Sequence, residues 1–438
     1  MKNMTGIQKS HKKWKIRLNT DRVLCFLDVL CLCLFGTLST LEEFLLPRFL
    51  RFFMWGIIAF YAVYRVSSLA AQRCRMPAVT TTLLLAMAVI YLIRNAYLRN
   101  GQETIVVYLG MLLLCFQAFR QALWRDYVLN ILEIIYLIYA VATIAFFFMP
   151  SFYTSRIATL FPDSTSSLIR LYNQGCMAGL TSHYSTNGMF LSAGVFVEIA
   201  LFIRRKDVKK LLSGAFLAIM VIALLMTGKR AHTLFTVMAL MAVYYVYDAN
   251  RRCGRLFKVI ALLMVAIFAF YLLSFYVPSL GIFWQRFLEA FNSDDVTNGR
   301  MGYWMLAFSL FTENPLLGIG WGQFQSLSVD VLGRPNHAHM VFLQLLCETG
   351  IIGFIIYCAW FVYMLRITVA VFTEIRRSNL RRDPQANAHM VFSLGYQVFF
   401  LLYCFTGNPL YERMTFVPYF FACAIAIFYR SAIRRCPA

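Results

Sequence analysis

The chain alternates long apolar runs with short polar segments along almost its whole length. The runs recur at the length that crosses a bilayer, which is about 20 residues. We therefore predict an all-α, polytopic membrane protein with about 12 transmembrane helices, forming a single integral membrane domain over residues 1–438. The predicted spans are 23–40, 50–69, 80–98, 104–120, 127–149, 185–203, 211–226, 231–248, 257–277, 338–365, 388–405 and 415–430.

Orientation follows from the basic residues between the runs. Most of the 41 Lys and Arg residues fall in alternate loops, and such loops lie in the cytoplasm. Both termini are then cytoplasmic. The basic stretch Lys2–Arg22 resembles the start of a signal peptide, but no small-residue cleavage site follows the first apolar run. We interpret that run as an uncleaved first span.

Composition excludes several classes of protein. Hydrophobic residues make up 60% of the chain, and the net charge is +21. In a soluble protein such a charge would point to nucleic acid. Here the basic residues lie between apolar runs, so topology and anionic membrane lipids account for them, and we predict no nucleic-acid partner. The 12 cysteines include no Cys-x-x-Cys pair, which argues against a metal site or a disulfide framework.

Two predicted outside loops are long, at 150–184 and 278–337. The second lies between spans nine and ten and is too long for a simple turn. Its segments Ile282–Phe291 and Arg300–Phe311 are amphipathic, and we expect short helices there at the outer interface. The glycine-rich run Gly318–Gly322 follows no strand and lacks dinucleotide-binding spacing. It predicts a turn with close backbone approach.

The tenth span opens with a histidine. We predict Asn336 as its N-cap and His339 in its first turn. The free N–H groups and the dipole there disfavour imidazolium, so a neutral His339 suits a general base. A polar residue capping a helix at the interface is the alternative. Glu348 falls on roughly the opposite face of this helix, so we expect it not to orient His339 directly.

Cations stand at three outward helix starts. Lys229 and Arg230 open the eighth span, Arg300 opens the short loop helix, and His337 and His339 open the tenth span. Helix N-termini already favour anions, and arginine adds bidentate recognition of phosphate oxygens. The pattern indicates a site for a phosphate or diphosphate group.

Each of these residues also has a plainer interpretation. Arg230 can snorkel to outer headgroups, and Arg300 can form a surface ion pair with Asp294 or Asp295. Trp304 shares a helix face with Arg300; it is a candidate for stacking on a sugar ring or for anchoring at the interface.

A second outward cluster, 179–188, carries small polar residues into the sixth span, and Arg170 lies upstream of it. We predict a loop packed near the site, with an ordinary outer turn as the alternative. Candidate substrate-binding residues are therefore His337, Trp304, Arg170, Asn187 and Lys229.

The sequence resembles the O-antigen ligase and Wzy-type polysaccharide polymerase superfamily, most closely over about 225–360. The marks are Arg230 opening a span, Arg300 and Trp304 before the Asn-Pro-Leu-x-Gly-x-Gly run 314–320, and the pattern His-x-x-x-Leu-x-x-Leu-x-Glu-x-Gly from His339. Met340 stands where the family often has Asn, and His337 is an additional histidine.

The resemblance implies a metal-independent, inverting glycosyltransferase without cofactors, in the inner (plasma) membrane of a bacterial cell. It would polymerise undecaprenyl-diphosphate-linked repeat units into a surface polysaccharide, such as capsule or O-antigen, on the extracytoplasmic side. His339 would take the proton of the acceptor hydroxyl. Arg230 and Arg300 would hold the diphosphate and stabilise the charge that develops as it leaves.

The implied partners are the lipid-linked donor, a glycan or lipid-linked acceptor, membrane lipids and a chain-length regulator. An O-antigen ligase that transfers finished glycan to an acceptor such as lipid A core would use the same site. A lipid-linked glycan flippase or transporter is the alternative from a different class. It would need charges near the middle of the membrane, whereas here they concentrate on one side.

Overall fold

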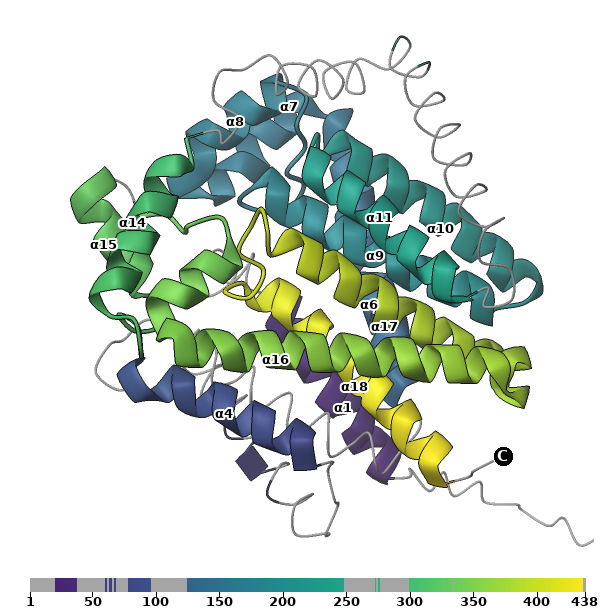
Figure 1. Cartoon of the computed structure of the whole chain (residues 1–438). Helices are drawn as coiled ribbons and strands as arrows, with labels where there is room; N and C mark the ends of the chain where they lie inside the picture. Colours follow the sequence, from purple (N-terminus) through teal and green to yellow (C-terminus); the bar gives the residue numbers. More distant parts are fainter. Residues whose placement is uncertain are drawn as a thin grey trace, which may run out of the picture.

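The computed structural model describes residues 20–37, 78–95, 124–247, 299–333 and 335–435, with a few isolated positions besides. Its regular structure in these ranges is helical (Figure 1), which confirms the all-α prediction. Nine of the twelve predicted spans coincide with helices, and the spans 50–69, 104–120 and 257–277 lie outside the described residues. These helices are α1 (Thr20–Thr37), α4 (Ala78–Asn95), α6 (Trp124–Phe147), α9 (Tyr184–Arg204), α10 (Asp207–Met226), α11 (Arg230–Tyr247), α16 (Val341–Arg377), α17 (Pro384–Tyr403) and α18 (Arg413–Arg435).

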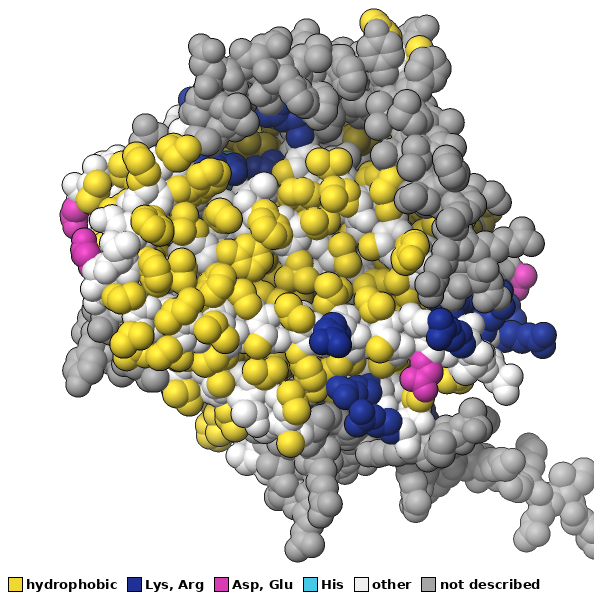
Figure 2. Space-filling model, in the orientation of Figure 1, with side chains coloured by type: hydrophobic (Ala, Val, Ile, Leu, Met, Phe, Trp, Pro, Cys, Tyr) yellow, Lys and Arg dark blue, Asp and Glu magenta, His cyan; other side chains and the backbone are white. Residues whose placement is uncertain are grey.

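Several of these helices have the character of membrane spans. Within the described ranges, α6, α9, α10, α16 and α18 are long and apolar enough to cross a bilayer. α10 is mostly exposed, and Val208, Leu211 and Ile222 point outward from it. Figure 2 shows a broad field of hydrophobic side chains on one face, with Lys and Arg gathered at its edges. A field of this kind faces lipid rather than water.

The centre of the bundle is formed by α9, α17 and α18, whose side chains are largely buried. α9 packs against α6, α10 and α17, while α17 also packs against α11, α16 and α18. A Cβ atom on Gly395 would lie 2.6 Å from the ring of Phe196. A small residue is therefore required where α17 approaches α9.

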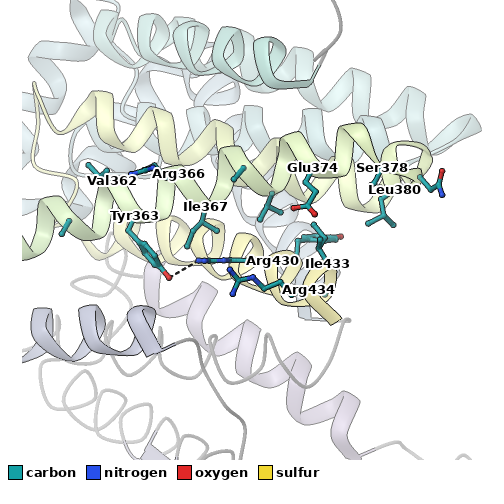
Figure 3. A pocket seen from close by; sticks show the side chains of 16 residues that line it. Val362, Tyr363, Arg366, Ile367, Glu374, Ser378, Leu380, Arg430, Ile433 and Arg434 are labelled. Atoms are coloured by element: carbon teal, nitrogen blue, oxygen red, sulfur yellow. Dashed lines mark hydrogen bonds between the residues drawn. The ribbon is translucent and has the colours of Figure 1, made fainter. Parts of the chain in front are cut away.

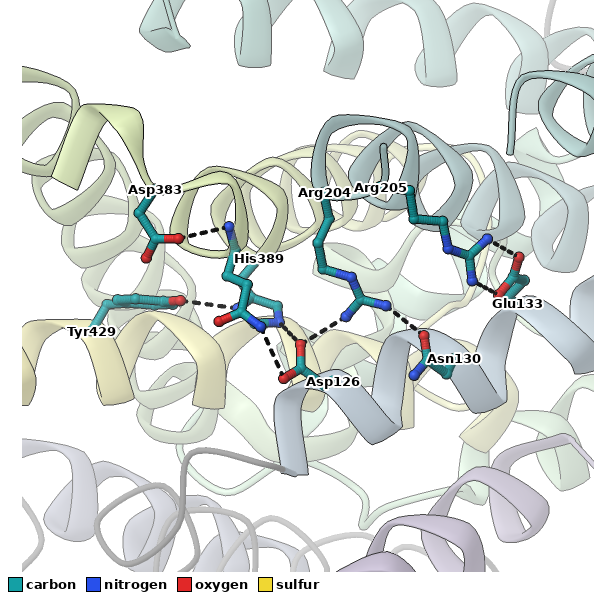
Figure 4. Close-up of polar contacts among 9 residues, drawn as sticks. Asp126, Asn130, Glu133, Arg204, Arg205, Asp383, His389 and Tyr429 are labelled. Atoms are coloured by element: carbon teal, nitrogen blue, oxygen red, sulfur yellow. Dashed lines mark hydrogen bonds and ion pairs between the residues drawn. The ribbon is translucent and has the colours of Figure 1, made fainter. Parts of the chain in front are cut away.

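Ion pairs connect the helices at the end of the bundle where α9 ends and α17 begins (Figure 4). Asp126 accepts a hydrogen bond from Arg204 at 2.7 Å, and the Nε2 atom of His389 lies 3.2 Å from the same carboxylate. Arg205 donates to both oxygens of Glu133. Carboxylates and arginines inside an apolar bundle are tolerated when they pair in this way.

The long loop regions contain further helices. α14 (Met301–Glu313) confirms the short helix expected at Arg300–Phe311, and Ile282–Phe291 lies outside the described residues. α15 (Gln323–Leu332) was not predicted; left-handed glycines cap both of its ends, Gly322 and Gly333. The 150–184 region folds into α7 (Pro150–Phe152), a π-helix (Tyr153–Ile157), two 3-10 turns (Ala158–Leu160 and Pro162–Ser164) and α8 (Thr165–Asn173).

The start of α16 differs from the prediction. The helix begins at Val341 with Met340 as N-cap, so Asn336 is not the N-cap and His339 is not in the first turn. His339 has a left-handed backbone with φ 54°, which cannot continue a right-handed helix. The amide of Val341 donates instead to the carbonyl of Cys404 at 2.9 Å, at the end of α17. The helix also runs past the predicted end at 365, to Arg377.

A break at Gly350 divides α16. Gly350 has φ 63° and ψ −172°, and the chain around it pairs with the segment 315–320. The backbone bonds run from Ile319 N to Cys347 O, from Gly320 N to Glu348 O and from Ile351 N to Pro315 O, each 2.9 Å. The polar groups that the break releases are thus satisfied inside the protein, as an apolar environment requires.

Two glycines make this pairing possible. A Cβ atom on Gly318 would lie 2.3 Å from the carbonyl carbon of Glu348, and one on Gly350 would lie 2.2 Å from the carbonyl oxygen of Leu316. Both glycines also have positive φ, which other residues rarely adopt. The close backbone approach predicted for the glycine-rich run is confirmed.

Candidate active site

Three segments that are distant in the sequence meet at one end of the molecule. They are the turn before α11, the start of α14 and the loop 335–340 before α16, here called the histidine loop. The charges of Arg300 and Lys229 act on His339, and the charges of Arg300 and Arg230 act on Lys229. In Figure 1, α14, α15 and the start of α16 lie together at the left. The cations predicted at three helix starts therefore share one site.

Side chains from α14 and α15 hold the histidine loop. The indole N–H of Trp304 donates to the carbonyl of Ala338 at 2.9 Å. Ser328 Oγ accepts from the amide of Asn336 at 3.0 Å and lies 3.2 Å from its carbonyl oxygen. Trp304 thus positions the residue between the two histidines, a contact that the sequence did not reveal.

Gln344, in the first turns of α16, clamps the same loop and was not singled out from the sequence. Its Oε1 accepts from the buried amide of Ala338 at 3.1 Å. Its Nε2 lies 3.1 Å from Glu348 Oε1 and 3.0 Å from His337 Nδ1. The amide is buried, so all three contacts form away from water.

This clamp fixes the protonation of His337. The Nε2 atom of Gln344 can only donate, so Nδ1 of His337 accepts, and the ring proton of the neutral form is on Nε2. Burial lowers the pKa of His337 to about 4, which keeps the ring neutral. A neutral ring with one nitrogen occupied by Gln344 and the other protonated has no lone pair to offer a substrate. His337 is therefore suited to position the loop.

Glu348 supports the clamp from the next turn. Its Oε1 also accepts from the amide of Phe324 at 3.2 Å, at the start of α15, where unpaired N–H groups favour a carboxylate. Glu348 does not contact His339, as expected, but it connects α15 to the histidine loop through Gln344. The sequence placed Glu348 on the correct helix but did not reveal this link.

His339 has a strained backbone conformation. It is one of two non-glycine residues with positive φ in the described part of the chain, a conformation that costs about 1–3 kcal/mol. Burial and the neighbouring charge of Arg300 lower the pKa of His339 to about 4. The ring is therefore neutral at pH 7 and able to accept a proton.

A cavity of about 600 Å³ lies beside His339. It is lined by Gly299, Arg300, Gly302, Tyr303, Leu332, Asn336 and His339. Arg300 also donates to the carbonyl of Thr406 at 3.1 Å, which holds the guanidinium near the turn after α17. A neutral histidine and a cation face the same space, together with Tyr303, whose ring offers an apolar face and whose hydroxyl can form hydrogen bonds.

Lys229 and Glu412 add opposite charges to the site. Lys229 lies with its Nζ atom 5.2 Å from the centre of the Tyr184 ring. Burial, with a contribution from the charges of Arg300 and Arg230, lowers its pKa to about 8. Burial raises the pKa of Glu412 to about 7, and Lys229 opposes that rise. Glu412 was missed because it lies more than 180 residues from Lys229 in the printed sequence.

Asn187 and Arg170 do not line the cavity. Asn187 is buried in α9, and its amide donates to Thr143 Oγ1 at 2.9 Å and to the carbonyl of Met177 at 3.2 Å. It therefore holds the turn before α9. Arg170 is exposed in the last turn of α8, and it is not among the charges that act on His339 or Lys229. The structure does not bring either of them to the cavity.

His183, which belongs to the predicted cluster 179–188, lies near Lys229. It caps α9, with its Nδ1 accepting from the amide of Ser185 at 3.2 Å. Burial and the charge of Lys229 lower its pKa to about 4. The signal in the sequence was its position directly before the sixth predicted span. Among the described residues, no group of three or more His, Cys, Asp or Glu side chains is arranged to hold a metal ion.

Comparison with known proteins gives one family. Residues 215–358 match the sequence model of the family Wzy_C, described as O-antigen ligase. This segment includes Lys229, Arg230, Arg300, the histidine loop and the Gly350 break. No curated protein matches the chain. The match indicates a bacterial membrane enzyme that processes lipid-linked glycans, and it confirms the resemblance to the O-antigen ligase and Wzy-type superfamily over the central third of the chain.

Proposed function

We propose that the chain is a metal-independent, inverting glycosyltransferase that polymerises undecaprenyl-diphosphate-linked repeat units into a surface polysaccharide. The observation that carries the proposal is a neutral, strained His339 facing the same cavity as Arg300. The reaction takes place on the extracytoplasmic side of the membrane, with both termini in the cytoplasm.

The cations bind the donor diphosphate. Arg300 offers a fork of donors that matches phosphate oxygens, and Lys229 and Arg230 add positive charge from the start of α11. The helix start contributes further N–H groups. When the bond between C1 of the donor sugar and the diphosphate oxygen breaks, these groups stabilise the negative charge on the leaving undecaprenyl diphosphate. Removing one such donor typically costs about 10²–10³ in rate.

His339 acts as the general base. The acceptor hydroxyl oxygen attacks C1 from the face opposite the diphosphate, its proton passes to His339, and the configuration at C1 inverts. Without bound donor, the His339 ring has a low pKa, partly because of the charge of Arg300. A bound diphosphate neutralises that positive charge, so the pKa of His339 rises toward its ordinary value of about 6.5. The base thus strengthens when the donor is in place.

An O-antigen ligase is the second candidate, because the matching family carries that description. A ligase uses the same donor chemistry and differs in its acceptor. The glycan profile of cells lacking the chain separates the possibilities. Single repeat units in place of a ladder support the polymerase, full-length glycan stranded on its lipid carrier indicates a ligase, and repeat units trapped inside the cell indicate a flippase and overturn the proposal.

A further inference from the structure

A large groove lies far from the histidine loop. It has a volume of about 1290 Å³ and runs between the last half of α16, the 3-10 helix η5 (Asn379–Arg382) and the end of α18 (Figure 3). Its walls are mostly apolar and include Val362, Ala370 and Ile433. This groove contributes nothing to the chemistry proposed above.

The groove lies at the opposite level of the membrane from the candidate site. After the break at Gly350, α16 continues from Ile351, and Glu374, which lines the groove, follows Ile351 by about 35 Å at 1.5 Å per residue. The hydrocarbon core of a bilayer is about 30 Å thick. The histidine loop and the groove therefore belong to opposite leaflets.

The charges at the groove are unbalanced. Three arginines line it, Arg366, Arg430 and Arg434, against one carboxylate, Glu374. Arg430 donates to the hydroxyl of Tyr363 at 3.1 Å, and Figure 3 shows Arg434 beside it. Arg366 and Arg434 are exposed, and neither forms an ion pair with another residue that the structure describes.

This combination matches one class of ligand. Arginines at the edge of an apolar groove, at headgroup level, suit a phosphate group, and the apolar wall suits a hydrocarbon chain. Basic pockets between transmembrane helices bind anionic lipid headgroups. We propose that the groove is a binding site for an anionic phospholipid, with its phosphate among Arg366, Arg430 and Arg434 and an acyl chain along α16.

The test measures phospholipid binding to the purified chain by native mass spectrometry in detergent. Phosphatidylglycerol is compared with phosphatidylcholine carrying the same acyl chains. We expect each chain to retain one phosphatidylglycerol molecule in preference to phosphatidylcholine. Each of the two arginines contacts the phosphate and contributes about fivefold to affinity, the order of magnitude found for one basic residue beside an anionic lipid, so the variant Arg366→Gln/Arg434→Gln binds about 25-fold more weakly. Both side chains are exposed, so the fold tolerates their replacement.

A matched control removes the same charge elsewhere. Arg377 and Arg381 are exposed at the same level but do not line the groove, so Arg377→Gln/Arg381→Gln keeps the parent affinity. Equal loss in both double variants would mean diffuse attraction and would overturn the site.

Two further measurements separate the lipid from its headgroup. Ala370→Trp fills the apolar wall and leaves the arginines in place, so binding of phosphatidylglycerol is lost while the chain stays folded. Glycerol phosphate at the same concentration should not compete. Full binding by Ala370→Trp, or displacement by glycerol phosphate, would show that the ligand is a soluble phosphate and would refute the lipid site.

Discussion

The Gln344 clamp gives the sharpest test of how the structure builds the site. Gln344→Met removes three contacts, to Ala338, His337 and Glu348, at nearly constant side-chain volume. The amide of Ala338 and part of the Glu348 carboxylate then stay buried without their partner. Each such loss costs about 1–3 kcal/mol.

The loss falls on a loop that is already strained at His339. If restoring the native loop conformation for catalysis then costs about 2 kcal/mol, the barrier rises by that amount and the rate falls about 30-fold. Arg300 and Lys229 lie on other elements and keep their places. We therefore expect kcat to fall about 30-fold, with KM for the donor little changed.

The assay is polymerisation of a defined lipid-linked repeat unit by the purified chain in lipid nanodiscs. Gln385→Met is the control, because it makes the same chemical change at an exposed position near the opposite end of the bundle, where the side chain makes one long contact of 3.5 Å to Asp126. A Gln344→Met protein that is folded and fully active would refute the clamp. A rise in KM at constant kcat would show that Gln344 serves donor binding instead.

Four further predictions concern the site and its support. The added methyl group of Gly350→Ala meets the backbone of Leu316, so this variant should not fold. Gly333 has a similar positive φ but lies in open space, so Gly333→Ala should lower the free energy of unfolding by only about 1 kcal/mol. Equal Tm values for the two variants would refute the close backbone pairing at Gly350. The pKa of His339 is lowered to about 4 in the free protein, and the bound diphosphate raises it. Because kcat/KM reports the free enzyme and kcat reports the enzyme with substrate bound, kcat/KM should persist to lower pH than kcat. Coincident pH profiles would contradict this linkage. Stability has the matching sign: the unfolded ring binds protons below about 6.5 and the folded ring does not, so this residue makes the protein less stable as the pH falls from about 6.5 to about 4. Chelators should leave the rate unchanged, and a loss that a divalent ion restores would contradict the metal-free mechanism.

Hydropathy alone located the helices well, because a bilayer demands runs of one length and composition. The glycine-rich run was also interpretable, since glycine marks close backbone approach, whereas Gly350 was noted only as part of the family pattern. The sequence did not show which segments pair. The backbones at Gly318 and Gly350 approach their partners because α16 is broken at Gly350, and no hydrophobic pattern reveals that break.

The predicted start of α16 was wrong for a similar reason. Local capping rules favour Asn336, but the helix begins where the amide of Val341 meets the carbonyl of Cys404, a contact across more than 60 residues of the printed sequence. Glu412 lies in the segment that follows this same carbonyl, which places it near Lys229. Asn187 was assigned to the site because of small polar neighbours, whereas its amide is used to hold a turn.

The role of His339 is the central claim, and one measurement tests it most directly. Single-turnover transfer is followed with the purified parent, His339→Ala and His337→Ala, alongside binding of the labelled lipid-linked donor. We predict that His339→Ala binds the donor and transfers it about 10²–10⁴ times more slowly, while His337→Ala is milder. Transfer by His339→Ala at close to the parent rate, or a larger loss in His337→Ala, would contradict the assignment of His339 as the base.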